Sequence, residues 1–418
     1  MNDILKAGGM VDAAAAALEP RVIGWRRDFH QHPELSNRET RTSQCVADHL
    51  RGLGMAVQTG VAHTGVVGLL DSGRPGPVVA LRADMDALPV AEEVDLPFAS
   101  RAKATYLGQE VGVMHACGHD CHVAILMGVA EILAGMRERL AGRVKFIFQP
   151  AEEGPPPGEE GGAALMIRQG VLENPKPDVI FGLHVFAGIE AGTIAYRPGP
   201  TLASSDRIKI VVDGRQTHGA LPWRGVDPIV ISSQIVLGLQ TIVSRQVDVT
   251  LEPAVVSIGA IRGGVRDNII PDRVEMLGTV RTFNEDMRRD IHARIRNTVE
   301  LIAKSADATA QVHFDNAYPV TVNDVPLTER MVPTLRRVAG ADRVLLGQKI
   351  TGYEDFSYYQ QKVPGFFYFV GITPPGTERR HCAPNHSPRF FVDESALALG
   401  VRSLAHLALD YMAAAGSP

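Results

Sequence analysis

The strongest constraint on the fold is a series of short apolar segments that stop at acidic residues or at histidine. Residues 78–83 stop at an aspartate, and residues 143–149 stop at a proline that precedes two glutamates. Residues 177–184 form a third such segment and end in a histidine. Between the first two segments, residues 121–140 have apolar side chains at helical spacing. Buried strands separated by a helix favour an α/β fold class with a mixed, largely parallel sheet.

The pattern changes from about residue 205. A helix is predicted at 225–246, because its Asp-Pro pair is a helix-start signal, and a second helix is predicted at 285–306. Strands are predicted at 207–212, 254–261, 272–283 and 309–316. The order βαββαβ is that of the ferredoxin-like fold. We therefore expect a ferredoxin-like domain at 205–316, inserted between two parts of a larger domain, 1–204 and 317–418.

Composition excludes several classes of protein. The net charge is −5 and no basic block is present, so no nucleic-acid partner is expected. The N-terminus lacks a basic region followed by an apolar run, so no signal peptide is expected, and no apolar stretch of about 20 residues predicts a membrane span. Four Cys are too few for a disulfide framework, which favours the reducing cytoplasm.

Residues 115–124, HACGHDCHVA, gather three His, two Cys and one Asp just before the helical segment. Thiolate and imidazole together favour Zn²⁺ or another late divalent ion. Ligands of an open α/β sheet bind beyond the carboxyl ends of its strands, so Glu152, Glu153, His184 and the distant His386 are further candidates. So many ligands favour two ions about 3.5–4 Å apart. One glutamate is then a ligand, and the other is the base that takes a proton from water.

Two other interpretations stay open from the residues alone. In the first, the chain is an amidase with Cys117 as nucleophile, His115 or His119 as its base, and Asp120 orienting the base. This leaves the two glutamates and His184 without a role. In the second, the chain is a non-catalytic metal-dependent binding protein, which would have no use for a general base.

Six motifs follow one another along the chain: ALRADMDALP, GVMHACGHDCH, QPAEEG, GLHV, GGVRDNIIPD and HSPRFFVDE. Together they resemble the dinuclear metal-dependent amidohydrolase/carboxypeptidase family. This family includes hippurate hydrolases, N-acyl-amino-acid amidohydrolases and indole-acetyl-amino-acid hydrolases. The resemblance implies a catalytic α/β domain, here 1–204 and 317–418, with an inserted lid domain that also dimerises.

The resemblance also implies a role for each matching residue. The implied ligands of two divalent ions, Zn, Mn, Co or Ni, are Cys117, His119, Glu153, His184 and His386. Glu152 is implied as the general base, and Asp86 as a carboxylate that orients a ligand. In the lid, His218 is implied to polarise the substrate carbonyl, often across the dimer, and Asn268 to hold substrate or transition state.

Two positions depart from the pattern common in similar sequences. Trp223 stands where His is common, and Tyr353 lies in the segment TGYEDF. Their bulky rings, together with Arg281, are candidates for substrate contacts. The sequence thus predicts a metal-dependent hydrolase that cleaves the amide bond of N-acyl amino acids or dipeptide-like substrates with a free carboxylate. It would be cytoplasmic and form a homodimer through the lid, or a higher homo-oligomer.

Overall fold

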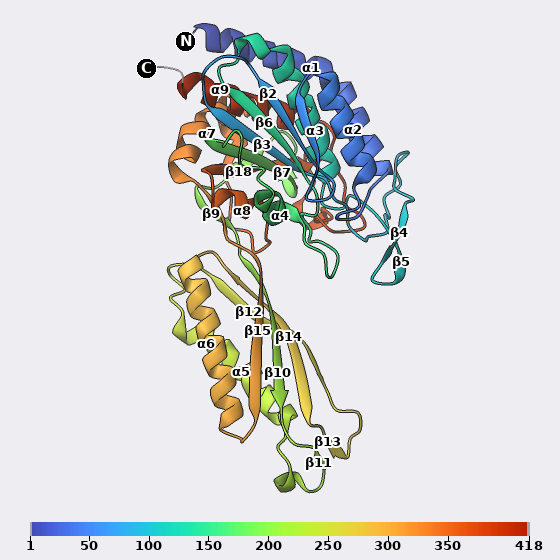
Figure 1. Cartoon of the computed structure of the whole chain (residues 1–418), viewed down its shortest axis with the longest axis vertical. Helices are drawn as coiled ribbons and strands as arrows, with labels where there is room; N and C mark the ends of the chain where they lie inside the picture. Colours follow the sequence, from blue (N-terminus) through green and yellow to red (C-terminus); the bar gives the residue numbers. More distant parts are fainter. Residues whose placement is uncertain (1, 416–418) are drawn as a thin grey trace. The chain divides into compact units, whose positions relative to one another are not determined.

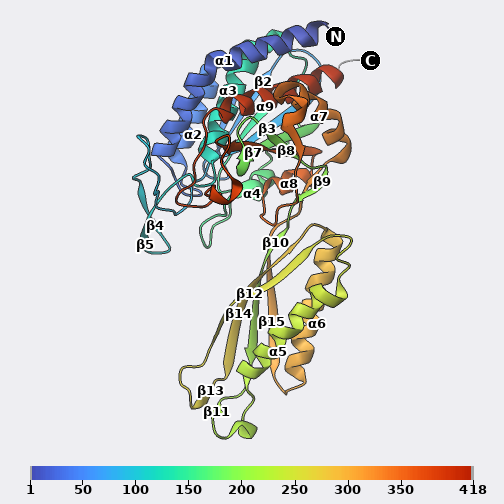
Figure 2. The ribbon, with the colours of Figure 1, turned by 180° about the vertical axis from the view of Figure 1, so that it is seen from behind.

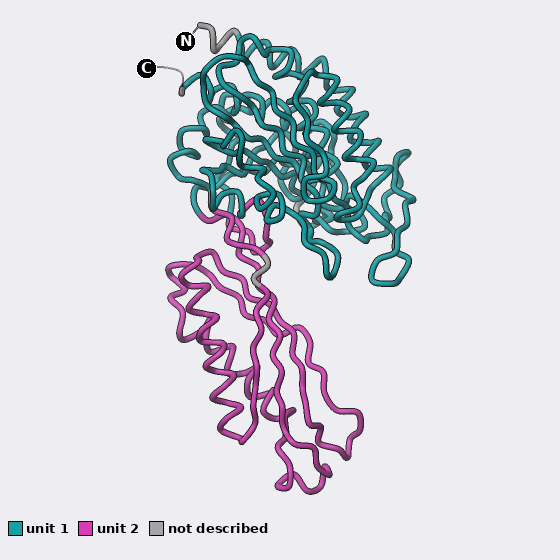
Figure 3. The backbone as a smooth tube through the Cα atoms, viewed as in Figure 1, with its two compact units in different colours: residues 1–199, 323–348, 358–418 teal, residues 200–322, 349–357 magenta. Residues whose placement is uncertain are grey.

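The computed structural model describes residues 2–415, apart from the side chains of residues 2–6, 316, 317, 379 and 415. The chain forms two compact units (Figure 3). The first unit comprises Met1–Gly199, Asn323–Gln348 and Tyr358–Pro418. The second unit comprises Pro200–Val322 and Lys349–Ser357. Each unit has its own hydrophobic core.

The first unit is built on an eight-stranded sheet in the order β1-β2-β6-β3-β7-β18-β8-β17. Figure 1 labels its strands β2, β6, β3, β7 and β18. In that order the strands are Ala56–Val61, Gly65–Asp71, Arg143–Gln149, Val78–Asp84, Val179–Glu190, Gly365–Thr373, Ile194–Tyr196 and Val344–Leu346. The central pairs β6–β3, β3–β7 and β7–β18 are parallel, while β1–β2, β2–β6 and β18–β8 are antiparallel. This confirms the predicted mixed, largely parallel sheet.

Among the described residues, seven helices lie wholly or partly in the first unit, and α8 begins in the second unit. They are α1 (Asn2–Gln31), α2 (Thr40–Gly52), α3 (His119–Gly135), α4 (Gly162–Arg168), α7 (Val325–Ala339), α8 (Phe356–Gln360) and α9 (Ala396–Ala415). The helices α1, α3 and α9 pack against one another, and α3 and α9 contact β3 and β7 (Figures 1 and 2). Helix α3 is apolar on nearly every side. This suits its position between the sheet and these helices, as in other core helices.

Shorter elements connect these parts. A hairpin is formed by β4 (Lys103–Tyr106) and β5 (Gln109–Gly112), and β9 (Gly199–Leu202) pairs with β16 (Thr321–Asn323). Short 3₁₀ turns lie at Arg137–Arg139, Ala341–Arg343 and Arg379–His381.

The second unit is an antiparallel sheet in the order β12-β14-β10-β15 with two helices. In chain order its main elements are β10 (Ser205–Asp213), α5 (Pro228–Thr241), β12 (Ala254–Gly263), β14 (Arg273–Thr282), α6 (Glu285–Lys304) and β15 (Thr309–Tyr318). The predicted βαββαβ order is thereby confirmed. The Asp-Pro signal acts as expected, since the Asp227 side chain accepts hydrogen bonds from the N–H groups of Ile229 and Val230. The short strands β11 (Thr217–His218) and β13 (Ile269–Ile270) pair beside a turn at Pro222–Arg224.

One segment, Pro228–Gln246, is long and apolar enough to cross a membrane by length and composition alone. It consists of α5 and the helical turn Ile242–Gln246 that follows it. A core helix of a soluble protein meets the same criterion, and Ile231, Ile235 and Leu239 pack in the core of the second unit. The segment is therefore only weak evidence against the prediction of no membrane span.

Candidate metal centre

Asp86, Glu152 and Glu153 follow the ends of two neighbouring strands. β3 and β6 end at the same level, because their last residues, Asp84 and Gln149, pair with each other. Asp86 follows β3, and Glu152 and Glu153 follow β6. The sequence predicts that the next strand ends at His184. That prediction is wrong, because β7 continues to Glu190 and pairs with β18 beyond the histidine. His184 therefore projects from within a strand.

Two further segments complete the group. Cys117 and His119 lie where the chain enters α3, on either side of Gly118, whose φ is +93°. A Cβ atom at Gly118 would lie 2.3 Å from a methyl carbon of Val185, so only glycine lets this turn approach β7 so closely. His386 comes from the loop before α9, and its backbone N–H donates to the carbonyl oxygen of residue 116 at 2.7 Å.

The structure brings the five predicted ligands into one cluster: Cys117, His119, Glu153, His184 and His386. Cys117 belongs to two groups, one with His119 and His184 and one with Glu153 and His386, and within each group the ligand atoms lie within 4.8 Å of one another. The Sγ of Cys117 is 3.4 Å from Nε2 of His184 and 3.2 Å from Nε2 of His386. This arrangement suits two ions that share one ligand. The role of these residues as ligands stays a prediction.

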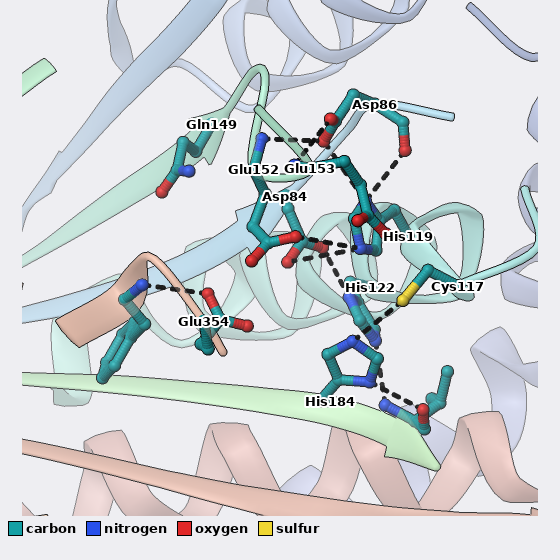
Figure 4. A network of polar contacts seen from close by, with 12 residues as sticks. Asp84, Asp86, Cys117, His119, His122, Gln149, Glu152, Glu153, His184 and Glu354 are labelled. Atoms are coloured by element: carbon teal, nitrogen blue, oxygen red, sulfur yellow. Dashed lines mark hydrogen bonds and ion pairs between the residues drawn. The ribbon is translucent and has the colours of Figure 1, made fainter. Parts of the chain in front are cut away.

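Backbone hydrogen bonds set the proton positions on two of the imidazoles (Figure 4). Nδ1 of His119 lies 2.8 Å from the carbonyl oxygen of Asp86, and Nδ1 of His184 lies 2.7 Å from that of Val185. A carbonyl oxygen only accepts, so each Nδ1 carries a proton and donates it. The Nε2 atoms of both rings are then directed to the cluster, the orientation that metal-binding histidines show.

One atom of the cluster, Nε2 of His119, is buried without a hydrogen-bond partner among the described residues. Oε1 of Glu153 lies 3.0 Å from Nε2 of His386. Buried polar atoms without a partner are rare in native proteins, and a bound cation would supply the missing partner. A thiolate, imidazoles and a carboxylate are also the donor set of Zn²⁺ and related ions. The residues present therefore fit divalent metal.

The charges around the cluster favour a cation. Burial raises the pKa of the Cys117 thiol well above its usual value, and the carboxylates of Glu153 and Glu152 raise it further. Burial alone would lower the pKa of His119, but the carboxylates of Asp84 and Asp86 outweigh it and raise that pKa to about 10. A divalent ion bound here would favour the thiolate and the neutral imidazole and so lower both pKa values.

Asp86 connects a proposed ligand to the glutamate turn. Its Oδ1 accepts the backbone N–H of Glu152 and its Oδ2 that of Glu153, each at 3.0 Å, and Oδ2 also accepts the Ser36 hydroxyl at 2.7 Å. Its own carbonyl oxygen accepts from His119 (Figure 4). One residue therefore holds both sides of the cluster, which supports the orienting role that the resemblance implies.

Sequence reasoning missed several supporting residues. Nε2 of His122 accepts the N–H of Val185 at 2.9 Å, so its Nδ1 donates to Asp84, at 2.5 Å. Asn385 donates to the carbonyl oxygens of Cys117, at 3.1 Å, and Val185, at 3.3 Å, and accepts the N–H of residue 187. The sequence signals that could have indicated them are Asp84, two positions before Asp86, and Asn385, next to His386.

The geometry does not support a cysteine nucleophile with an oriented base. Asp120 accepts hydrogen bonds from Nε of Arg26 and Nδ1 of His30, both at 2.9 Å, and so orients neither predicted base. Neither ring nitrogen of His115 has a hydrogen-bond partner among the described residues. The raised pKa of Cys117 also opposes formation of a free thiolate.

The remaining predicted residues lie in the second unit. His218 pairs with Ile269 in the β11–β13 ladder, and Gly219 donates its N–H to the carbonyl oxygen of Asn268 at 2.8 Å, so His218 and Asn268 are near neighbours. Trp223 is 73% exposed. The Arg281 guanidinium packs over the Tyr353 ring at 5.4 Å. The substrate contacts assigned to these residues stay predictions.

A cavity of about 150 Å³ adjoins the cluster in the first unit. Its lining is mixed: apolar side chains such as Leu35, Leu88 and Pro156 lie beside the polar Ser36, Arg38 and Thr105, and Glu153 is also a lining residue. A cavity of similar volume with apolar walls holds a benzene ring in another protein. The cavity is therefore large enough for a small apolar group.

Comparison with known proteins agrees with this geometry. The sequence profile of peptidase family M20/M25/M40 matches residues 80–410. Thermostable carboxypeptidase 2 of Saccharolobus solfataricus is 42% identical over 397 residues, covering 94% of this chain and 96% of that protein. N-acetylcysteine deacetylase of Bacillus subtilis is 38% identical, covering 95% of this chain and 98% of that protein. The crystal structure of a dinuclear metal-binding peptidase of the M20 family from Bacillus subtilis matches with a TM-score of 0.79 and 36% identity, over 95% of this chain and 99% of that one.

Proposed function

Because the chain belongs to peptidase family M20/M25/M40, a family of metal-dependent hydrolases, we propose that it cleaves the amide bond of N-acyl amino acids or similar peptide-like substrates with a free carboxylate. The observation that carries this proposal is the pair of imidazoles whose Nε2 atoms face a buried thiol and two adjacent glutamates. Similarity to a carboxypeptidase and to a deacetylase supports amide hydrolysis without choosing between the two.

The cluster would hold two divalent ions, of Zn, Mn, Co or Ni, with Cys117 as the shared ligand. His119 and His184 would complete one site, and Glu153 and His386 the other, as their grouping suggests. Bound there, the ions would polarise the substrate carbonyl and make the attacking water more acidic.

Glu152 is the proposed general base. Its side chain is almost fully buried, and its carboxylate groups with His119 and Glu153, while its backbone N–H is held by Asp86. From this position Glu152 would take a proton from the attacking water and pass it to the leaving nitrogen. A base in this role needs no bond to the metal.

Residues of the second unit would bind the substrate. His218 would donate a hydrogen bond to the substrate carbonyl and Asn268 would hold the developing negative charge, and both lie next to each other in that unit. Arg281, Trp223 and Tyr353 would contact the acyl group or the amino acid. The cavity beside Glu153 is a further place for a small group of the substrate.

A homodimer through the second unit is part of the proposal, as is a cytoplasmic location. Helix α5 exposes Ile229, Val230 and Leu237, which are 44%, 54% and 72% exposed. Such apolar side chains on one helix suit burial against a second copy. Light scattering on the purified protein tests this, since a monomer at micromolar concentration would contradict it.

The main test removes the metal and then the base. Dialysis against a chelator should abolish hydrolysis of a panel of N-acyl amino acids and dipeptides, and Mn²⁺, Zn²⁺, Co²⁺ or Ni²⁺ should restore it. Glu152→Gln should keep the bound metal and lose about 10²–10⁴-fold in kcat. Full activity of the metal-free protein would refute the proposal.

The two alternatives give other results. A cysteine-nucleophile amidase would be trapped at Cys117 by an alkylating reagent without metal and would form an acyl-enzyme detectable by mass spectrometry. A binding protein would hold N-acyl amino acids tightly without turnover.

A further inference from the structure

Glu39 is a fully buried acidic side chain outside the metal cluster. It immediately precedes α2, but its side chain does not cap that helix. Its Oε1 instead accepts the backbone N–H groups of Asn37, at 3.0 Å, and Ala151, at 2.9 Å, and its Oε2 accepts the Thr64 hydroxyl at 2.5 Å. A carboxyl group is costly to bury unless it is hydrogen bonded. The three hydrogen bonds therefore account for the burial of Glu39 and show which segments it joins.

Ala151 begins the turn that carries Glu152 and Glu153. Its φ is +53°, in the left-handed region that a residue with a Cβ rarely adopts, and it is 1% exposed. Three consecutive N–H groups of this turn are accepted by two buried acidic side chains. Ala151 donates to Glu39, while Glu152 and Glu153 donate to Asp86. Asp86 thus fixes the second and third amides, and Glu39 fixes the first.

The backbone angle at Ala151 determines where the next side chain points. Without an acceptor for its N–H, this residue would gain by returning to negative φ, which would rotate the following peptide group and the Glu152 side chain. We propose that Glu39 is a positioning residue, whose carboxyl oxygen Oε1 holds Ala151 in the left-handed conformation and so directs Glu152 to the metal cluster. This inference rests on the proposed function, because Glu39 can affect catalysis only if Glu152 is the general base.

Three variants separate positioning from general stability. Glu39→Ala should lower kcat at least 10-fold while KM changes less than 3-fold, because the base is misdirected and substrate contacts stay. Glu39→Gln keeps an oxygen for the two N–H groups and an NH₂ group for the Thr64 hydroxyl, so its kcat should stay within about 3-fold of wild type. Ala151→Gly added to Glu39→Ala should recover part of kcat, because glycine adopts positive φ freely.

Glu34 supplies the matched control. Its carboxylate accepts the backbone N–H groups of Arg41 and Thr42 and the Thr40 hydroxyl, so it also holds amides at the start of α2. None of its hydrogen bonds reaches residues 151–153. Glu34→Ala should therefore lower the melting temperature and leave kcat within about 2-fold of wild type.

Hydrogen exchange of the metal-free protein gives a readout that does not depend on activity. In Glu39→Ala the peptide that contains residues 150–153 should exchange at least 10-fold faster than in wild type, and in Glu34→Ala it should exchange at the wild-type rate. Unchanged exchange at this turn in Glu39→Ala would overturn the inference. So would a kcat of Glu39→Gln as low as that of Glu39→Ala in folded protein. If the wild type cleaves no amide, the proposed function fails, whereas the exchange rates still decide whether Glu39 holds the turn.

Discussion

Replacing Asp86 by Asn removes one acceptor from the centre of the proposed site. Each of its two oxygens accepts one buried backbone N–H, from Glu152 and from Glu153, at 3.0 Å. The NH₂ group of asparagine donates and cannot accept, so one of these N–H groups loses its partner whichever way the amide is placed. A buried donor without a partner costs about 1–3 kcal/mol, so the free energy of unfolding of the metal-free protein should fall by that amount.

Ser36→Ala is the control for this substitution. It removes the hydrogen bond from the Ser36 hydroxyl to Asp86, at 2.7 Å, but leaves both backbone N–H groups with an acceptor. A hydrogen bond to a charged group contributes about 1.5–3 kcal/mol, so Ser36→Ala should also lower the free energy of unfolding, but without leaving a buried N–H group unpaired.

Urea unfolding followed by tryptophan fluorescence measures both variants. The chain has two Trp, one in each unit, so a Trp223→Phe background leaves Trp25 to report on the first unit. Asp86→Asn should also weaken metal binding by about 10–100-fold, the usual effect of losing a residue that orients a ligand. If Asp86→Asn is as stable as wild type and binds metal as tightly as wild type, the reasoning about Asp86 is wrong.

Three further predictions follow from the same contacts. Burial, and then the Asp86 carboxylate, raise the pKa of Glu39 from 4.5 to about 8. Between these pH values the native protein holds a proton on Glu39 that the unfolded chain releases. The contribution of Glu39 to the free energy of unfolding is therefore full below pH 4.5 and is lost as pH rises towards about 8. In urea unfolding between about pH 5 and pH 8, wild type should therefore lose stability relative to Glu39→Gln, and parallel curves would contradict this. Asn385→Ala should weaken metal binding about 10-fold in calorimetric titration, because the Cys117 carbonyl loses its donor, and unchanged affinity would count against that support. Cys117→Ser should bind fewer than two ions per chain in elemental analysis, and two tightly held ions would show that the thiol is not the shared ligand.

The parts of the fold that local pattern determines were predictable. The central strands and the βαββαβ order follow from apolar periodicity and from signals such as Asp227-Pro228, which caps α5 as expected. The end of β7 was not predictable in this way. That strand continues past His184 because β18 pairs with it, and β18 comes from a segment more than 170 residues further along the chain.

The supporting residues of the site depend on contacts between distant segments. Asn385 reaches the Cys117 carbonyl across 268 positions, and Glu39 reaches the Ala151 amide across 112. No local pattern indicates either contact. The left-handed turn is also hidden, because an alanine occupies a position where glycine would have marked it. Motifs could therefore suggest the ligands, while the residues that hold them became visible only in three dimensions.

Anomalous X-ray scattering from crystals of the Zn²⁺- or Mn²⁺-loaded protein tests the central claim most directly. The account predicts two metal peaks per chain, about 3.5–4 Å apart, with Cys117 Sγ bound to both ions. His119 and His184 should complete one site, and Glu153 and His386 the other. A single peak, or two peaks with Cys117 bound to neither, would contradict it.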